Sequence, residues 1–150
     1  MSSLFAFLHH LAAFALVATL VLEFVLVQGE LDARNARRLR VTDLLFGISS
    51  GLVLVVGLLR VFYFEKGAAY YFHSAPFIAK LALFLAVGLL SIYPTMVFAS
   101  WGRLLKQGQL PVLADAQRRR LRAVMHAELT GVVLVILCAV LMARGVGTFG

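Results

Sequence analysis

The chain has 150 residues, of which 62% are hydrophobic and 14% are charged, and its formal net charge is +7 at pH 7. Soluble domains average about 45–50% apolar and about 25% charged residues, so this composition excludes an ordinary soluble domain. The positive charge does not indicate nucleic-acid binding, because ten of the fourteen Lys and Arg residues lie in two short segments between long apolar runs. That distribution is typical of a multipass membrane protein, and the length predicts a single domain over residues 1–150.

Four apolar runs follow one another along the chain, each near the roughly 20 residues needed to cross the hydrocarbon core. Backbone groups find no water in lipid, so each run must be helical. The first run has no basic residue before it and is longer than the apolar part of a signal peptide, so we expect it to remain as a helix. The sequence predicts an all-α fold, a transmembrane four-helix bundle with helices at about 4–27, 43–64, 76–98 and 123–143, and a short helix at 114–122 that leads into the last one.

The basic segments between the runs predict the orientation of the chain. The loop at 28–42 has four Arg residues and the loop at 102–122 has six Lys or Arg residues, whereas the middle loop has only Lys66. Cytoplasmic loops of membrane proteins are enriched in Lys and Arg. We therefore expect both basic loops in the cytoplasm of a bacterial inner membrane, with the N-terminus, the middle loop and the C-terminus outside. Trp101 follows the third run, at the level where an interfacial aromatic belt is expected.

Small residues predict contacts between the helices. Gly47 and Gly51 form a G-x-x-x-G pair in the second run, and such pairs let helix backbones approach closely in lipid. Either a dimer interface or packing within the bundle would explain the pair, and we favour packing within the bundle because four helices must pack together. Cys138 is the only cysteine of the sequence, so no intrachain disulfide is possible, and we expect it to pack as a small apolar side chain.

Ionisable residues inside the apolar runs are candidates for function, since a charge at the centre of a membrane helix costs at least about 2.5–3.5 kcal/mol. With a rise of 1.5 Å per residue, His9, Arg60 and Lys80 lie roughly 6–7 Å inside the outer boundary. His10 adjoins His9, and His73 lies just outside, in the middle loop. The sequence thus predicts a group of histidines and cations at the outer ends of the first three helices.

A second layer of ionisable residues lies near the cytoplasmic ends of the helices. Spacing by sevens puts His9, Leu16 and Glu23 on one stripe of the first helix, which should face the interior because lipid would penalise both polar groups. His126 and Glu128 point in roughly opposite directions on the fourth helix and are not expected to act as a pair. The layer consists of Glu23, Asp43, Tyr93, His126 and Glu128.

The outer group is compatible with haem b, since imidazole is an axial ligand of haem iron and Arg and Lys pair with propionates. His9 is the favoured iron ligand and His10 or His73 the second, while Arg60 and Lys80 would hold the propionates. Zinc is less attractive, because a zinc site needs three or four converging ligands. The alternative without a cofactor is that Arg60 and Lys80 reach out to the lipid headgroups along their apolar stems.

A family of four-helix bacterial predicted inner-membrane proteins resembles this chain in four segments: LHHLAAFALVATLVLEF, GLLRVFYFEKG, FIAKLALFLAVGLLSIYPT and LMARG. This resemblance covers almost the whole chain and implies architecture rather than activity. A more distant likeness is to the HemJ-type protoporphyrinogen oxidases, which are small helical membrane proteins that bind haem b. His9, after Leu8, and Lys80, before Leu81, match that family's histidine in the first helix and lysine in the third. The family's next tryptophan and later histidine are replaced by apolar stretches, so the likeness implies a cofactor pocket rather than oxidase activity.

Three functional hypotheses follow from the sequence. The leading one is an inner-membrane, haem-b-binding protein with a redox or porphyrin-related role. The small size and the Gly47 and Gly51 pair are also compatible with a homo-oligomer, or with an accessory or structural subunit of a larger membrane complex. A small transporter or proton-handling protein could use Glu23, His9 and Lys80, although the sequence has no inverted repeat. The lipid bilayer is a predicted partner in every case, and nucleic acid in none.

Overall fold

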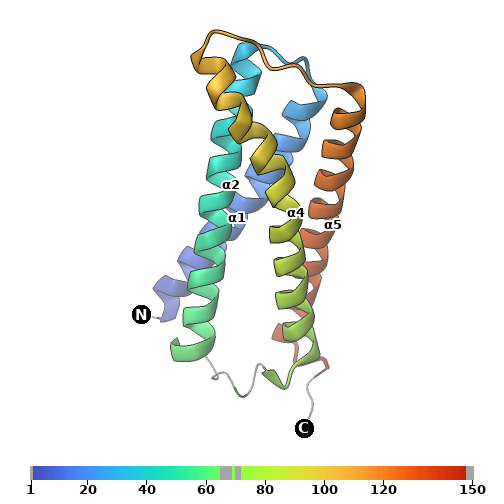
Figure 1. Cartoon of the computed structure of the whole chain (residues 1–150). Helices are drawn as coiled ribbons and strands as arrows, with labels where there is room; N and C mark the ends of the chain where they lie inside the picture. Colours follow the sequence, from blue (N-terminus) through green and yellow to red (C-terminus); the bar gives the residue numbers. More distant parts are fainter. Residues whose placement is uncertain (1, 65–68, 70–71, 148–150) are drawn as a thin grey trace.

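The protein folds as a bundle of four long helices (Figure 1). The computed structural model describes residues 2–64, 69 and 72–147. Each of the four helices is long and apolar enough to cross a membrane, so the all-α, four-helix fold predicted from the sequence is confirmed. The helices are α1 (Ser2–Gln28), α2 (Ala33–Leu59), which continues into a short π-helix η1 (Arg60–Phe64), α4 (Ala75–Lys106) and α5 (Asp115–Ala143).

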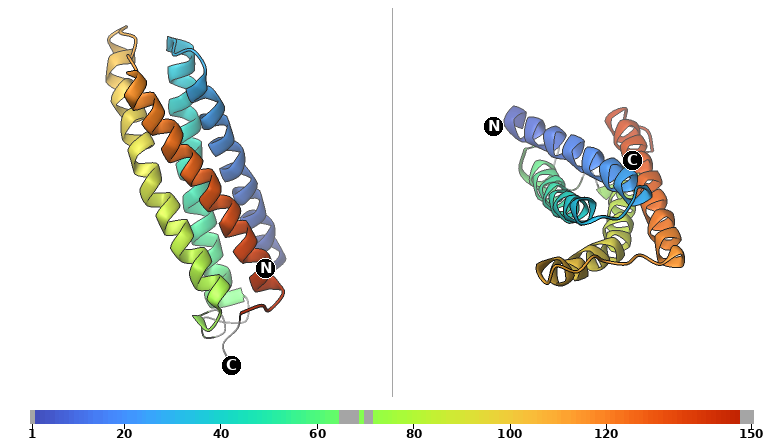
Figure 2. Two further views of the ribbon diagram at one scale, coloured as in Figure 1. Left: turned by 90° about the vertical axis from the view of Figure 1, so that its right-hand side faces the viewer. Right: turned by 90° about the horizontal axis from the view of Figure 1, so that it is seen from above.

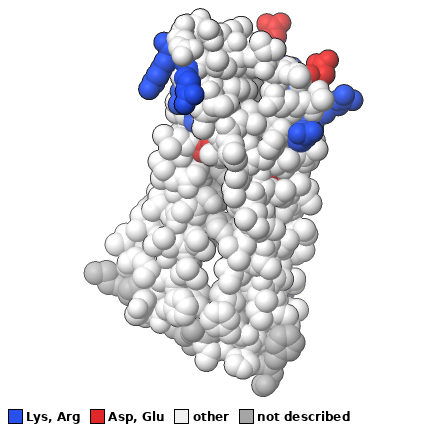
Figure 3. Space-filling view, in the orientation of Figure 1, with Lys and Arg blue, Asp and Glu red and all other residues white. Residues whose placement is uncertain are grey.

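The helices pair as two antiparallel hairpins, α1 with α2 and α4 with α5 (Figure 2), and contacts within each hairpin are more extensive than contacts between them. The beginning of α1 and the end of α5 lie at one end of the bundle, which we name the terminal end. The connections 29–32 and 107–114 lie at the other end, which we name the basic end because Lys and Arg side chains gather there (Figure 3). The side of the membrane on which each end lies stays a prediction.

The helices extend beyond the apolar runs at the basic end. α2 begins at Ala33 rather than near residue 43. α5 begins at Asp115, so the short helix predicted at 114–122 and the helix predicted at 123–143 form one continuous helix. Asp32 caps α2 by accepting a hydrogen bond on Oδ1 from the backbone N–H of Asn35, at 2.7 Å. Hydropathy marks where the apolar side chains end, but Ala, Arg, Leu and Gln also favour helix outside the hydrocarbon. The predicted loops 28–42 and 102–122 are therefore largely helical.

The buried core is largest at the basic end. There Phe98 and Trp101 of α4 pack with Leu39 of α2 and Met125 of α5. Trp101 is only 4% exposed, and its ring centroid lies 5.1 Å from that of Phe98, so it is a core residue and its assignment to an aromatic belt was wrong. Further clusters lie in the middle of the bundle, around Leu20, and towards the terminal end.

Close helix packing occurs at other glycines than the sequence indicated. Gly47 and Gly51 are exposed, and a Cβ added at either position would meet nothing within 4 Å, so packing of this pair within the bundle is wrong. The α4–α5 contact instead depends on Gly131, where an added Cβ would lie 2.5 Å from Val87 Cγ2. The prediction for Gly47 and Gly51 used residue spacing alone. Because α2 is apolar on several faces, its sequence does not distinguish the face that points into the bundle.

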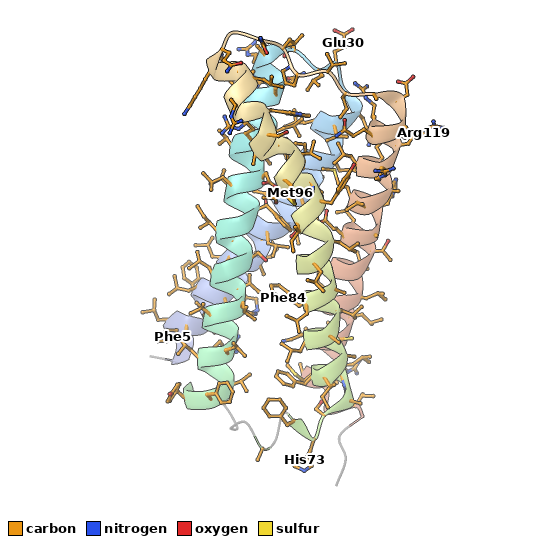
Figure 4. The ribbon with its side chains drawn as sticks, viewed as in Figure 1. Phe5, Glu30, His73, Phe84, Met96 and Arg119 are labelled. Atoms are coloured by element: carbon orange, nitrogen blue, oxygen red, sulfur yellow. The ribbon has the colours of Figure 1, made fainter. Side chains whose placement is uncertain are left out.

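α4 bends in the half nearer the basic end, beside Met96 (Figure 4). Pro94 lies inside this helix, where it lacks the N–H that would bond one turn back and its ring crowds the preceding carbonyl. Such a residue is a common cause of a helix bend. The next residue, Thr95, contacts α2 and is part of the candidate functional site.

Candidate functional site

Three carboxyl side chains meet inside the bundle, between the core cluster at the basic end and the one in its middle. Glu23 of α1 and Glu128 of α5 are each 1% exposed. The carboxyl groups of Glu23 and Asp43 of α2 are hydrogen-bonded to each other, and Glu128 interacts electrostatically with both. Thr95 of α4 donates its hydroxyl to Asp43 Oδ1, at 3.1 Å. Each long helix thus contributes one residue to this carboxyl cluster: Glu23, Asp43, Thr95 and Glu128.

The carboxyl cluster has few hydrogen-bond partners. Both Oε atoms of Glu128 and Oε1 of Glu23 are buried and have no hydrogen-bond partner among the residues that the structure describes. Within the same residues, no Lys or Arg side chain forms an ion pair with any member of the cluster. Two carboxyl groups can hydrogen-bond only if the O–H of one donates to the other. The contact between Glu23 and Asp43 therefore needs a proton.

The stripe predicted on α1 explains why Glu23 points inward. Leu16 is 5% exposed and Glu23 1% exposed, and His9 is half-buried, so this stripe faces the interior as predicted. On α5, Glu128 is buried, whereas His126 is exposed and packs edge-on against Phe24 with ring centroids 4.6 Å apart. These two residues do point different ways, as the helix repeat indicated.

At the terminal end, the structure brings together three of the five predicted cofactor residues. His9 of α1 interacts electrostatically with Arg60 at the start of η1 and with Lys80 of α4. The imidazole lies against α2, since its Cε1 is 3.2 Å from the position of a Cβ added to Gly57. Lys80 Nζ lies 5.8 Å from the centroid of the Phe77 ring. We name His9, Arg60 and Lys80 the cationic cluster.

The other two predicted ligands, His10 and His73, point elsewhere. The His10 Nδ1 lies 2.7 Å from the backbone oxygen of Ala6, and its ring is nearly perpendicular to that of His9, with centroids 6.0 Å apart. His73 is exposed at the terminal end, its side chain pointing out of the bundle (Figure 4), and its Nδ1 contacts the backbone oxygen of Ala69. His10 thus contacts the backbone of its own helix, and His73 points away from the cationic cluster.

The arrangement of acidic and histidine side chains does not indicate a site for a bare metal ion. In the ranges 2–64, 69 and 72–147, no group of three or more His, Cys, Asp or Glu side chains is placed to hold one. The carboxyl cluster itself consists of carboxyl groups that contact one another and one hydroxyl donor, Thr95. The sequence predicted that its three acidic members lie at one depth in the membrane, but it did not predict that they contact one another. It missed Thr95 altogether, because a Thr in an apolar helix often bonds only its own backbone.

Comparison with known proteins supports the membrane assignment. The family model described as a predicted membrane protein, DUF2214, matches residues 1–147. No curated protein matches the chain. No solved structure matches it either.

Proposed function

The chain belongs to the DUF2214 family of predicted membrane proteins, and from the interior of the bundle we propose that it is a proton-handling membrane protein. The supporting observation is the carboxyl cluster, in which Glu23 and Glu128 are almost completely buried without a cationic partner among the described residues. In this proposal the cluster takes up a proton from water at one side of the membrane and releases it at the other. The membrane is the bacterial inner membrane, with the basic end in the cytoplasm.

Energetic cost favours a functional reading of the cluster. Each acidic side chain at membrane depth costs about 2.5–3.5 kcal/mol on insertion scales, so three of them are a large burden for a bundle of this size. Apolar side chains of similar volume would pack at least as well. Polar groups that reduce stability are typical of functional sites. A proton is the ligand that matches two carboxyl groups in contact, since one of them must donate an O–H to the other.

The position of the cluster suggests how proton binding could affect the fold. Glu23 and Asp43 belong to the α1–α2 hairpin, whereas Thr95 and Glu128 belong to the α4–α5 hairpin. A proton shared by carboxyl groups supplies a hydrogen bond, while loss of protons leaves like charges close together in a medium of low dielectric. Deprotonation would therefore place like charges on Glu128 and on the Glu23–Asp43 pair and push the two hairpins apart, whereas protonation would remove this repulsion.

Proton flux into liposomes tests the proposal. Purified protein is reconstituted in liposomes that contain a pH-sensitive dye, and a potassium gradient with valinomycin supplies the driving potential. We expect the wild-type protein to acidify the lumen and Glu23→Gln to reduce the flux to that of protein-free liposomes, because an amide cannot exchange the proton. Infrared difference spectroscopy should show a protonated-carboxyl band that disappears in the same variant.

The matched control is Glu30→Gln, which removes an exposed carboxylate in the connection between α1 and α2. It should leave both the flux and the infrared band unchanged. A wild-type flux equal to that of empty liposomes would refute the proposed function, even with the infrared band present. In that case the cluster would be a structural hydrogen-bond network.

A second candidate function is binding of haem b at the terminal end, supported by the cationic cluster. His9 fits a single axial ligand, and Arg60 and Lys80 fit partners of the propionates, since all three come together from different elements. His10, whose Nδ1 contacts the Ala6 backbone oxygen, and His73, which points out of the bundle, support a second axial ligand less well than His9 supports the first. Haem bound in this way would supply electron transfer, and the contribution of the chain would be one imidazole and two cations.

Absorbance spectroscopy tests the haem candidate. Protein purified in detergent from haem-replete cells should give a pyridine haemochrome spectrum of haem b, and His9→Ala should lose it while His10→Ala keeps it. The contrast between neighbouring histidines separates ligation from a general effect on folding. A colourless wild-type preparation would rule this candidate out and would leave the proton-handling proposal untouched.

A further inference from the structure

A cavity of about 470 Å³ lies between α1 and α2, where these helices approach the basic end. Its volume is within the range of about 300–1,000 Å³ that is common for small-ligand sites. It is separate from both the carboxyl cluster and the cationic cluster, and none of their members lines it. The lining residues are Leu22, Leu26, Arg37, Arg38, Val41 and Thr42.

One part of the cavity wall is apolar and faces the lipid. Leu22 is 48% exposed and Val41 57% exposed, and both belong to segments long and apolar enough to cross a membrane. Side chains that are this open on the outer surface of a transmembrane bundle contact acyl chains rather than water. This wall therefore suits a hydrocarbon chain.

The other part of the wall is cationic. Arg37 and Arg38 are exposed, and neither forms an ion pair with a carboxylate anywhere in residues 2–64, 69 and 72–147. They precede Val41 and Thr42 by one helical turn each, so the guanidinium groups and the apolar wall share one face of α2. Towards the basic end, this face changes from apolar to cationic within about one turn.

We propose that this cavity binds an anionic phospholipid of the leaflet at the basic end. Arg37 and Arg38 would bind the phosphate, which a guanidinium group can engage through two parallel hydrogen bonds. One acyl chain would lie along Leu22 and Val41. Two unpaired cations favour a headgroup with net negative charge over a zwitterionic one, whose own ammonium group would compete with them. This inference is independent of the proton-handling proposal.

Lipid binding by the purified protein tests the inference. Native mass spectrometry in an uncharged detergent measures the affinity for phosphatidylglycerol and for phosphatidylcholine. We expect the wild-type protein to prefer phosphatidylglycerol. The double variant Arg37→Gln/Arg38→Gln should bind it about 30-fold more weakly, because each lost charge weakens binding about fivefold. Val41→Trp, which keeps every charge but fills the apolar wall, should also weaken binding.

The matched control is Arg119→Gln/Arg120→Gln, which removes the same charge from exposed positions of α5 outside the cavity. It should bind phosphatidylglycerol as the wild-type protein does, and Arg37→Lys/Arg38→Lys should keep most of the affinity. Equal weakening in both double Gln variants would overturn the inference, since net charge alone would then explain the binding. Displacement of the lipid by inorganic phosphate at the same concentration would also overturn it, because the acyl chain would contribute nothing.

Discussion

Glu128→Met should make the protein more stable while abolishing its proton flux. Both Oε atoms of Glu128 are buried and have no hydrogen-bond partner in the described residues, and the side chain is 1% exposed. Replacing poorly compensated buried ionisable groups with apolar side chains often stabilises a protein by about 1–4 kcal/mol. We expect a gain of about 1–3 kcal/mol in the free energy of unfolding. Circular dichroism during unfolding in mixed detergent micelles measures it, and the liposome assay measures the flux.

Two comparisons make the result for Glu128 interpretable. Glu30→Gln should change neither stability nor flux, since its side chain is exposed at the basic end. Glu128→Gln should abolish the flux without the gain in stability, because it keeps a buried polar group that has no hydrogen-bond partner among the described residues. If Glu128→Met instead lowered stability, the carboxyl group would be a structural link between the hairpins, and the functional reading of the cluster would fail.

Gly131→Ala should lower the free energy of unfolding by about 1–3 kcal/mol, the usual cost of overpacking a core by one group. An added Cβ would lie 2.5 Å from Val87 Cγ2, so one of the two helices must move. Val87 is 5% exposed, and a β-branched side chain has little freedom at χ1, so the side chain cannot turn aside. The better helix propensity of Ala, about 1 kcal/mol, offsets only part of this cost. Unfolding in mixed micelles measures the change.

The chain offers a matched control for Gly131. Gly51→Ala adds the same methyl group to a helix where nothing lies within 4 Å, so it should be neutral or stabilising by about 1 kcal/mol or less. A double-mutant cycle with Val87→Ala should show a coupling energy of about 0.5–3 kcal/mol, because the two positions touch. Additive effects at Gly131 and Val87 would contradict the packing described for α4 and α5.

The sequence predicted the fold well because hydropathy and loop charge are properties of whole segments. It found all four helices, and their bounds differ mainly at the basic end, where helix continues past the hydrocarbon through residues such as Arg37 and Arg103. Helix propensity and the Asp32 cap determine where the helices begin and end at the basic end. A hydropathy average measures neither of these properties.

The candidate sites were only partly predictable, because depth along a helix can be read from a sequence but the contacting face cannot. Depth alone put Glu23, Asp43 and Glu128 in one layer, and the structure joins them. Depth also grouped His10 with His9, although consecutive residues on a helix point about 100° apart and the helix repeat alone directs His10 to another face. The predicted packing of Gly47 and Gly51 within the bundle was wrong for the same reason. A spacing of four places two residues on one face of a helix but does not show which helix, if any, that face contacts.

The pairing of sequence neighbours has a consequence for how the chain is made. α1 packs most extensively with α2, and α4 with α5, so each pair can leave the insertion machinery as a preassembled helical unit. Such local contacts require little loop closure and form early. Gly131 already meets Val87 within the α4–α5 hairpin. Assembly then reduces to one docking step, in which Asp43 meets Thr95 only after all four segments have entered the bilayer.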